Sequence, residues 1–556
     1  MFNKNLEAIT NLALKRRLAK ISNIESKIGI SYCITPSNDY VLLKNDVPFD
    51  DLNNPLEAVR KMINDSIKNE MLSNDIIINF GIGLGYLLDE TFNRFPSKIF
   101  VYEPDIYTLH FVLNNVDISE HLSSGRVYIT NDLDELISHL SSSYLTKDKV
   151  EILYLQNYVI AKNKEMLMLT QKVFDACKSR MLDVATITKF SKRWMVNTIE
   201  NFARIRDNNA YLLSDLEGKF IGQTALIIAA GPSLTDNIAD IQKNRDKFVI
   251  FAVNKTVKYL LQNGIFPDFV VALDAANMEA TLGGFNNFFE KINCIMDMRS
   301  DRTIMDRGFN KVFFNFSESD FFIKKVAKYN PFLKFYEAGG SASTLALVSA
   351  VKMGFSKIIF AGLDLAFKDN VIYANGEVME RINQEQMLVD DVKKNLVKVR
   401  SVNGAMVYTR DDYLAFIKHF ETLIKQLNYN EIYNLTSFGA YIEGIQAVKF
   451  EDVELNTPKS LNQLNLVEPF KFNLKEFIDE EFCNINNIIN VLSKGTFSTA
   501  LVNAVVKSMF IYQYLQAEVL NVLQRNFDAE LADDFIARVK YAIKGIVGLL
   551  QKNKLI

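Results

Sequence analysis

The stretch that decides the fold class is Thr224-Ala-Leu-Ile-Ile-Ala-Ala-Gly-Pro-Ser-Leu-Thr-Asp236. Its apolar and small residues predict a strand buried on both faces, Gly231-Pro232-Ser233 ends that strand, and an amphipathic helix is predicted from Asp236. Such a turn lies at the carboxyl edge of a parallel sheet, where free backbone N–H groups and a helix N-terminus can hold a phosphate. An ordinary strand-to-helix loop shows the same local pattern, so the rest of the chain must decide between the two.

The same alternation of strand and helix continues after this stretch. Phe248–Asn254, Pro267–Asp274 and Lys357–Asp364 are predicted strands, and each ends in a polar residue. The small-residue run Gly339–Thr344 opens a further helix. This order predicts a mostly parallel sheet that helices cover on both faces.

A second unit of this kind lies nearer the N-terminus. The strand Asp75–Phe80 runs into Gly81-Ile-Gly-Leu-Gly-Tyr86, and the next strand ends at Glu103. An acidic residue about 20 positions after a glycine-rich turn is where a nucleotide fold places its ribose-binding carboxylate. The same turn is common in α/β proteins without a ligand, so ligand binding by this domain stays open.

The predicted fold class is therefore α/β, with two Rossmann-like domains (N-terminal and central), a helical linker and a helical C-terminal domain. The linker has helical spacing and lacks Pro and Gly, and the chain is helix-rich after Asn473. The predicted boundaries are residues 1–165 for the N-terminal domain, 166–215 for the linker, 216–450 for the central catalytic domain and 451–556 for the C-terminal domain.

The composition excludes several classes of function. A chain of 556 residues with 49% hydrophobic content can bury several cores, and a net charge of −3 gives no basic field for nucleic acid. The four cysteines are scattered without a Cys-x-x-Cys pair, which is typical of a reducing cytosol. Neither a signal peptide nor a membrane-spanning run is visible. We therefore expect a cytoplasmic protein without membrane insertion.

Familiar catalytic motifs are missing from the sequence. Neither glycine-rich turn is followed by Gly-Lys-Ser/Thr, and there is no His-Glu-x-x-His pair and no Gly-x-Ser-x-Gly elbow with partners. The only Asp-x-Asp, Asp132 to Asp134, is predicted to lie on a solvated helix face. We expect neither a metal nor a cofactor.

The carboxyl ends of the central strands should line one crevice. The residues expected to converge there are Gly231, Pro232, Ser233, Asn254, Asp274, Ser341, Ser343, Thr344 and Asp364. Hydroxyls at a helix start suit a phosphate or a carboxylate, although helix capping alone would explain one serine.

One histidine is a candidate for acid–base chemistry. His110, His121 and His139 belong to the N-terminal domain, and His419 lies on a predicted helix of the central one. Both a structural role and a general-base role fit His419.

Taken together, several short motifs resemble the motility-associated factor (Maf) glycosyltransferases that modify flagellin. The motifs are Ala230-Gly-Pro-Ser-Leu234, Val253-Asn-Lys255, Gly264-Ile-Phe-Pro-Asp268, Leu273-Asp274, Gly340-Ser341 with Thr344, and Ala361-Gly-Leu-Asp364. The resemblance includes Gly81–Tyr86 with Glu103-Pro104, so it spans most of the chain. That family is similar in its central domain to bacterial sialyltransferases. The resemblance implies a CMP-activated nonulosonic acid donor, of pseudaminic or legionaminic type, and Ser/Thr acceptors on flagellin.

The resemblance also implies roles for individual residues. The CMP part would contact Gly231, Pro232, Ser233 and Asn254, and the phosphate or the sugar carboxylate would contact Ser341, Ser343 and Thr344, with Gly340 and Gly362 also substrate-binding. Tyr373 would donate to the departing phosphate. Fixed hydroxyl and backbone donors can replace a metal in this chemistry. The sialyltransferases use a histidine as base, but none lies in a matching motif here, which leaves Asp274, Asp364 and His419 as candidates.

Three other functions remain open. The archaeal hydroxymethylpterin pyrophosphokinases share a Gly-Pro-Ser-Leu type of domain but are much smaller than this chain. A methyltransferase could use the N-terminal domain, where Gly81–Tyr86 and Glu103 resemble an S-adenosylmethionine pocket. A non-catalytic protein could instead bind flagellin through its helical domains.

Overall fold

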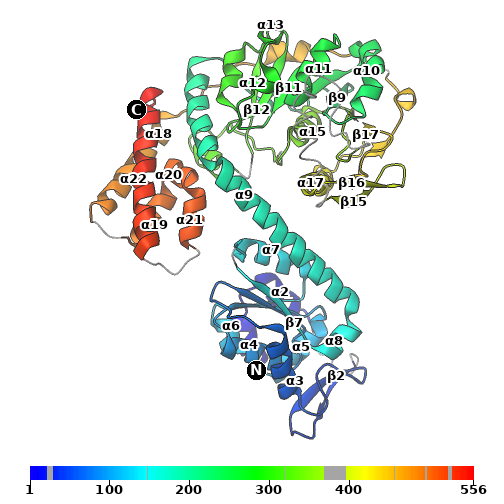
Figure 1. The fold of residues 1–556 in the computed structure, drawn as a ribbon, viewed down its shortest axis with the longest axis vertical. Coiled ribbons are helices and arrows are strands. Elements are labelled where there is room, and N and C mark those ends of the chain that lie inside the picture. Colours follow the sequence, from blue (N-terminus) through cyan, green and yellow to red (C-terminus); the bar gives the residue numbers. More distant parts are fainter. Residues whose placement is uncertain are drawn as a thin grey trace. The chain divides into compact units, whose positions relative to one another are not determined.

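The computed structural model describes residues 1–21, 29–146, 148–317, 320–337, 339–367, 396–455, 458–494, 497–523 and 529–556. It divides into two compact units, Met1–Ile187 and Thr188–Ile556, which are described separately below (Figure 1). The long helix α9, Asn163–Asp207, contributes to both.

The N-terminal unit is built on a four-stranded parallel sheet in the order β6-β5-β4-β7. Its strands are β4 (Ile76–Phe80), β5 (Lys98–Tyr102), β6 (Val127–Thr130) and β7 (Val150–Tyr154). Every residue of β4 is buried, as the run of isoleucines predicts for a strand covered on both faces. The accompanying helices are α1 (Phe2–Ala8), α2 (Leu12–Leu18), α3 (Pro55–Ser66), α4 (Tyr86–Arg94), α5 (Ile106–Asn115), α6 (Ser119–Ser123), α7 (Leu133–Ser143) and α8 (Gln156–Ala161). A small antiparallel sheet joins β1 (Ile30–Ile34), β2 (Tyr40–Lys44) and β3 (Val47–Pro48).

The second unit contains a nine-stranded sheet in the order β18-β17-β14-β9-β10-β11-β12-β13-β8. All of its strand pairs are parallel. The strands are β8 (Tyr211–Leu212), β9 (Thr224–Ile228), β10 (Val249–Val253), β11 (Phe269–Ala272), β12 (Asn293–Asp297), β13 (Val312–Asn315), β14 (Lys357–Ala361), β17 (Ile432–Leu435) and β18 (Gln446–Ala447). The mostly parallel sheet predicted from the sequence is confirmed.

Helices cover both faces of this sheet. Neighbouring residues of β9 point to opposite sides: Leu226 belongs to one core cluster and Ile227 to the other. The first cluster includes α10 (Leu234–Lys243), α11 (Val257–Gln262) and the end of α9, and the second includes α15 (Ala342–Met353) and α17 (Asp411–Leu427). Shorter helices are α12 (Glu279–Leu282), α13 (Asn286–Phe289) and α14 (Phe321–Ala327), and β15 (Val397–Arg400) pairs with β16 (Met406–Thr409) in a hairpin.

The C-terminal part of the second unit is helical, and its helices gather together in Figure 1. They are α18 (Lys475–Leu492), α19 (Thr499–Lys507), α20 (Met509–Tyr514), α21 (Gln516–Leu523) and α22 (Ala529–Lys552). The ring of Phe477 on α18 lies 5.4 Å from that of Phe322 and 5.6 Å from that of Phe510, centroid to centroid, so these helices extend the first core cluster. The predicted fold class is confirmed, while the boundaries of the three domains and the linker stay a prediction.

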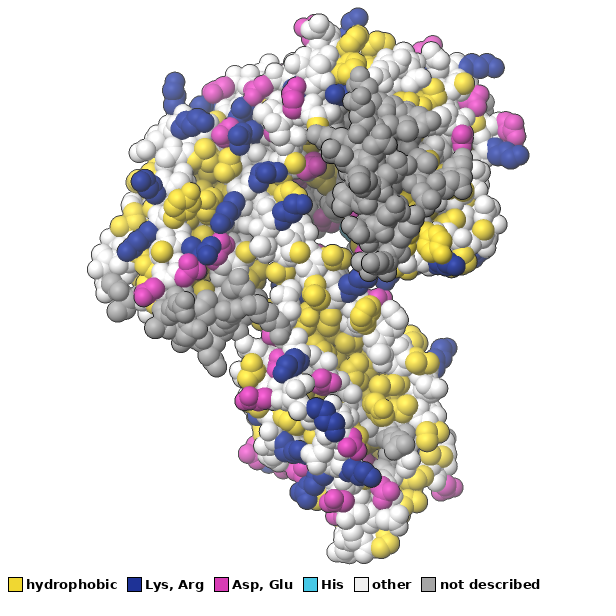
Figure 2. All heavy atoms as spheres, viewed as in Figure 1, with side chains coloured by type: hydrophobic (Ala, Val, Ile, Leu, Met, Phe, Trp, Pro, Cys, Tyr) yellow, Lys and Arg dark blue, Asp and Glu magenta, His cyan; other side chains and the backbone are white. Residues whose placement is uncertain are grey.

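The surface carries charges of both signs. On the face shown in Figure 2, basic and acidic side chains lie interspersed among hydrophobic and neutral ones. Within the described ranges, no helix has both the length and the apolar character that crossing a membrane requires.

Two buried asparagines of α9 fix the loops that leave the sheet. Asn201 donates from its amide to the carbonyl oxygens of Met298, at 2.9 Å, and Ser300, at 3.1 Å. Asn197 donates in the same way to Ala275 and Arg299, at 3.0 Å each. These bonds hold the segments that follow β11 and β12.

We expect Asn201→Leu to lower the free energy of unfolding by about 2–6 kcal/mol, because it leaves two buried carbonyl oxygens without a donor at about 1–3 kcal/mol each. Urea denaturation of the full chain measures the loss. The control Asn209→Ala changes an exposed residue nearby and should stay within about 0.5 kcal/mol of the wild type. A loss below about 1 kcal/mol for Asn201→Leu would contradict this role.

Candidate functional site

The turn that follows β9 and the turn that follows β14 are in direct contact. The N–H of Gly231 donates to the carbonyl oxygen of Gly362 at 2.8 Å. A Cβ atom on Gly231 would lie 2.5 Å from that oxygen, and one on Gly362, whose φ is +74°, would overlap the carbonyl oxygen of Ala229. Both positions need glycine because the two backbones approach so closely.

This contact lies where the sheet topology reverses. The chain adds β10 to β13 on one side of β9 and then returns to place β14 on the other side. Helix α10 leaves β9 toward one core cluster, whereas α15 and α17 belong to the opposite cluster. Ligands of open α/β sheets bind at such a switch point, outside the carboxyl ends of the strands. The predicted convergence of Gly231–Ser233 with Asp364 is therefore present in the structure, and Gly362 lies at the same point.

Asp364 is buried between these two turns. One oxygen of its carboxylate accepts the N–H of Ser233 at 2.8 Å, and the other accepts the hydroxyl of Thr436, which follows β17, at 2.7 Å. Asp364 is only 1% exposed, so these two donors must replace the hydrogen bonds that water would otherwise give to its carboxylate. Thr436 lies in no motif, and sequence reasoning missed it.

The backbone donors of the Gly-Pro-Ser turn differ from the expectation that they are free. Pro232 has no N–H, and the N–H of Leu234 donates to the carbonyl oxygen of Gly231 at 3.1 Å. The N–H groups of Thr235 and Asp236 donate to Pro232 and Ser233, at 3.2 Å each. Since Gly231 and Ser233 are also engaged, every N–H from Gly231 to Asp236 already has a protein acceptor. The hydroxyl of Ser233 is buried and has no hydrogen-bond partner among the described residues.

The serines that begin α15 form a capping box. The hydroxyl of Ser341 accepts the N–H of Thr344 at 3.2 Å, and the hydroxyl of Thr344 accepts the N–H of Ser341 at 3.3 Å. Thr344 is buried, Ser341 and Ser343 are half-buried, and Gly340 is exposed just before them. Capping therefore explains Ser341 and Thr344 but leaves Ser343 unexplained.

His419 on α17 lies against the loop that leads into α15. A Cβ atom on Gly339, whose φ is +64°, would overlap the imidazole ring. Its Nε2 atom is buried and has no hydrogen-bond partner in the described part of the chain. Burial lowers the pKa of His419, and the nearby Glu337 opposes that shift. The structure thus brings His419 to the same run of small residues that the sequence singled out.

The remaining predicted residues occupy neighbouring strand ends. Asn254 is buried immediately after β10, and Asp274 is exposed two residues after β11, where its carboxylate accepts the N–H of Ala276 at 2.9 Å. Tyr373 lies outside the described residues.

Arg299 is a cation at this edge that sequence reasoning missed, and it lies two residues after the end of β12. Its guanidinium Nε lies 3.0 Å from the carboxylate of Asp297 and 3.3 Å from that of Asp320. Burial works to lower the pKa of Arg299, but these two carboxylates raise it on balance. Its charge is therefore already paired with protein groups.

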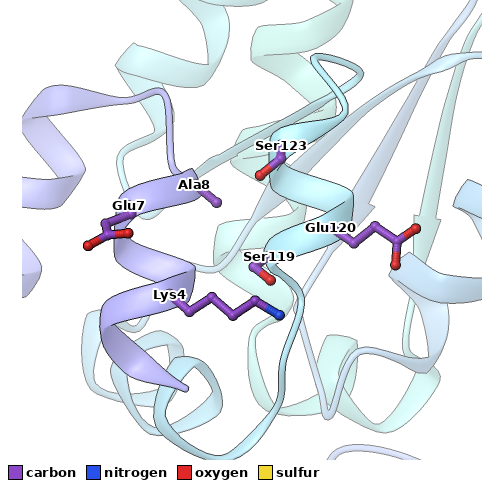
Figure 3. Close-up of a pocket in the computed structure, with 6 residues that line it drawn as sticks. All are labelled: Lys4, Glu7, Ala8, Ser119, Glu120 and Ser123. Atoms are coloured by element: carbon purple, nitrogen blue, oxygen red, sulfur yellow. The ribbon is translucent and has the colours of Figure 1, made fainter.

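Two cavities stand out among the described residues. One of about 620 Å³ lies beside the Gly-Pro-Ser turn and is lined by Ser233, Thr436 and Phe450 among others. Another, of about 490 Å³, is an open hollow between α1 and α6 of the N-terminal unit, shown in Figure 3, with Lys4 and Ser119 in its wall. The second contains no predicted site residue, whereas the first adjoins the switch point.

The glycine-rich turn of the N-terminal unit is filled by the protein itself. A Cβ atom on Gly81 would lie 2.7 Å from the ring of Tyr158. The Tyr158 hydroxyl donates to Glu103, which also accepts the N–H of Ile82 at 3.2 Å. Burial raises the pKa of Glu103 to about 7. The acid predicted to face a ribose is thus surrounded by protein groups.

No group of three or more His, Cys, Asp or Glu side chains in the described ranges is arranged to hold a metal ion.

Comparisons with known proteins support the sequence interpretation at the level of fold. The family model "6-hydroxymethylpterin diphosphokinase MptE-like" matches residues 196–370. The solved structure of a MAf glycosyltransferase from Magnetospirillum magneticum AMB-1 superposes with a TM-score of 0.66 and 16% identity, covering 100% of this chain and 96% of that one. The chain therefore has the fold of that glycosyltransferase over its full length, and the predicted resemblance is confirmed in fold.

A curated relative matches over a shorter range. An uncharacterized protein of Treponema pallidum (strain Nichols) is 31% identical over 100 residues, which is 18% of this chain and 45% of that protein. The match spans less than half the length of that relative.

We expect Gly362→Ala to lower the free energy of unfolding by about 3 kcal/mol or more, because the new methyl group meets a backbone carbonyl and the residue keeps a positive φ. Gly404→Ala is the matched control, since Gly404 also has a positive φ (+87°) but nothing lies within 4 Å of an added Cβ. It should lose only about 1–2 kcal/mol. If chemical denaturation gives the same loss of unfolding free energy for both variants, the close approach at Gly362 does not contribute to stability.

Proposed function

We propose that this chain is a glycosyltransferase that moves a nonulosonic acid, of pseudaminic or legionaminic type, from its CMP-activated donor to Ser or Thr of flagellin. The observation that carries the proposal is the meeting of the Gly231–Ser233 turn with Gly362 and Asp364 at the switch point of a fold shared with a MAf glycosyltransferase. In this proposal the protein acts in the cytoplasm and serves flagellum assembly and motility.

The CMP part of the donor would lie against Gly231, Pro232, Ser233 and Asn254. The buried hydroxyl of Ser233 supports this placement, because an unpaired buried hydroxyl costs free energy that a ligand hydrogen bond would recover. Gly362 would complete this wall of the crevice through its contact with Gly231.

The donor's phosphate or sugar carboxylate would lie at the start of α15, near Gly340, Ser341, Ser343 and Thr344. The first N–H groups of a helix have no acceptor inside the helix, and the helix dipole favours an anion there. Negative charge grows on the phosphate as the sugar leaves, so fixed donors at this position would stabilise the transition state without a metal ion. Tyr373 would donate to the same departing phosphate.

The contacts of the three candidate bases favour His419. Both carboxylate oxygens of Asp364 already accept hydrogen bonds from the protein. Asp274 is exposed, so water solvates its carboxylate and competes with an acceptor hydroxyl for it. His419 keeps a buried Nε2 without a described partner, and burial keeps its pKa low enough for the ring to be neutral near pH 7. The acceptor oxygen would attack the anomeric carbon of the sugar as the bond between that carbon and the CMP phosphate oxygen breaks. The acceptor proton would pass to His419, and CMP would leave with the bonding electron pair.

A pterin pyrophosphokinase is the second candidate, because the matching family model bears that description. That model covers residues 196–370, whereas the likeness to the glycosyltransferase covers the whole chain, which favours glycosyl transfer. The methyltransferase alternative gains no support from the N-terminal turn, where Tyr158 packs on Gly81. The hypothesis of a non-catalytic flagellin-binding protein does not explain why the buried hydroxyl of Ser233 has no partner among the described residues.

We expect CMP to raise the melting temperature of the full chain, since saturating ligand at 100 times its dissociation constant adds about 2.7 kcal/mol of stability. Ser233→Ala should weaken CMP binding about fivefold, the equivalent of about 1 kcal/mol for one hydrogen bond. The exposed Ser123 of the N-terminal unit gives a matched control, Ser123→Ala, which should bind CMP as the wild type does. A shift with ATP or S-adenosylmethionine but none with CMP would refute the proposal.

We also expect the rate of transfer to flagellin, followed by mass spectrometry of the acceptor, to fall as the pH drops through a value below 6.5. The pKa of His419 is lowered from that ordinary value, so the ring is neutral and able to accept a proton above its own pKa and is charged below it. His419→Gln should lose about 10²–10⁴-fold in kcat and should lack this acidic limb. His139→Gln is the control, and an unchanged rate for His419→Gln would assign the base elsewhere.

A further inference from the structure

We propose that Asp364 and Thr436 are positioning residues: Asp364 occupies the N–H of Ser233 and Thr436 holds Asp364, so that the Gly231–Ser233 turn contacts the nucleotide through the Ser233 hydroxyl. The inference rests on the proposed function and specifies how one wall of its donor site works. It assigns a role to Thr436, which no motif marks, and it changes the role expected for Asp364.

The first step is the hydrogen-bond chain that ends at the turn. The N–H of Gly439 donates to the Thr436 hydroxyl oxygen at 3.0 Å, and that hydroxyl donates to one oxygen of Asp364 at 2.7 Å. The other oxygen of Asp364 accepts the N–H of Ser233 at 2.8 Å. The loop after β17 is thereby linked through one carboxylate to the start of α10.

The second step is that the chain leaves this carboxylate little room to move. The N–H of Ala440 donates to the backbone oxygen of Asp364 at 2.7 Å. A Cβ atom on Gly439 would lie 2.9 Å from the Cα of Asp364, and one on Gly231 would lie 2.5 Å from its carboxylate oxygen. Asp364 is therefore enclosed by backbone from two turns and cannot swing away to take a proton from an acceptor.

The third step concerns what remains for a ligand. The glycine-rich phosphate loops of nucleotide-binding folds work because their backbone N–H groups point at the phosphate. Here each N–H from Gly231 to Asp236 donates to the protein, with Ser233 bonded to Asp364. The Ser233 hydroxyl is the polar group of the turn that has no partner among the described residues, and Ser233 lines the cavity of about 620 Å³ together with Thr436.

The fourth step is energetic. Because the N–H of Ser233 is fixed by a charged acceptor, its hydrogen bond is stronger than one between neutral groups. The bond fixes the backbone on which the Ser233 side chain turns, so the hydroxyl has fewer orientations to lose when a ligand binds. Thr436 acts one bond further away, by holding the carboxylate that holds Ser233.

The test is a double-mutant cycle of CMP affinity, measured by calorimetry on the full chain well below its melting temperature. Ser233→Ala and Thr436→Val should each weaken CMP binding about fivefold, the equivalent of about 1 kcal/mol for one hydrogen bond. The double variant should be no weaker than either single variant, because Thr436 acts only through the Ser233 hydroxyl. Thr436→Ser keeps the hydroxyl and should restore the affinity of the wild type.

Each contrary outcome is distinct. Additive losses in the double variant, or wild-type affinity in Thr436→Val, would show that Thr436 does not act through Ser233 and would overturn the inference. Unchanged affinity in Ser233→Ala would show that the turn binds CMP through other groups, and would overturn it as well. A wild-type chain that binds ATP or another nucleotide but not CMP would refute the proposed donor, and the same cycle run with that nucleotide would still decide the role of Thr436.

Discussion

The buried carboxylate of Asp364 is the interaction on which the architecture of the switch point depends. A carboxylate that is 1% exposed is stable only if donors replace the water it has lost, and Ser233 and Thr436 provide them from two different strand ends. The same carboxylate requires glycine at 231, because a side chain there would occupy its space, while Gly362 is required by the nearby carbonyl oxygen of Ala229. The segments that follow β9, β14 and β17 are thus joined to one another at the carboxyl ends of these three strands.

The helices that surround this point are placed by the sheet rather than by their own sequences. Helix α10 begins after β9 ends and α15 ends before the parallel strand β14 begins, so both helices start toward the carboxyl edge of the sheet, one on each face. Helix α15 is apolar almost all round, with eight of its residues buried, so its position is fixed by packing. His419 reaches the same region because α17 packs on the face that α15 covers.

The parts of this arrangement that the sequence predicts are those with a local pattern. Buried parallel strands appear as apolar runs, and a strand that ends in Gly-Pro-Ser or Gly-Leu-Asp predicts its own turn. Thr436 is different, because its partner Asp364 lies 72 positions away, and no periodicity relates the two. The contact of Ser233 with Asp364 spans 131 positions, so the local sequence gives no sign of it. From the local pattern alone, the turn is predicted to have free N–H groups, but in the folded chain these groups donate to protein acceptors. Arg299 and the contact of His419 with Gly339 depend on the tertiary fold in the same way.

The two Rossmann-like units show what distinguishes one glycine turn from another. In the N-terminal unit the space beside Gly81 is taken by the ring of Tyr158, whose hydroxyl in turn engages Glu103. In the central unit the space beside Gly231 is taken by a carboxylate, which engages the backbone and leaves a serine hydroxyl unpaired. A glycine after a buried strand therefore indicates that something approaches closely, but not whether that neighbour is a ligand or the protein. Each turn also has a buried polar atom without a described partner nearby, Asp50 Oδ2 beside Gly83 in the N-terminal unit and the Ser233 hydroxyl in the central unit, so an unsatisfied polar atom does not by itself distinguish the two turns.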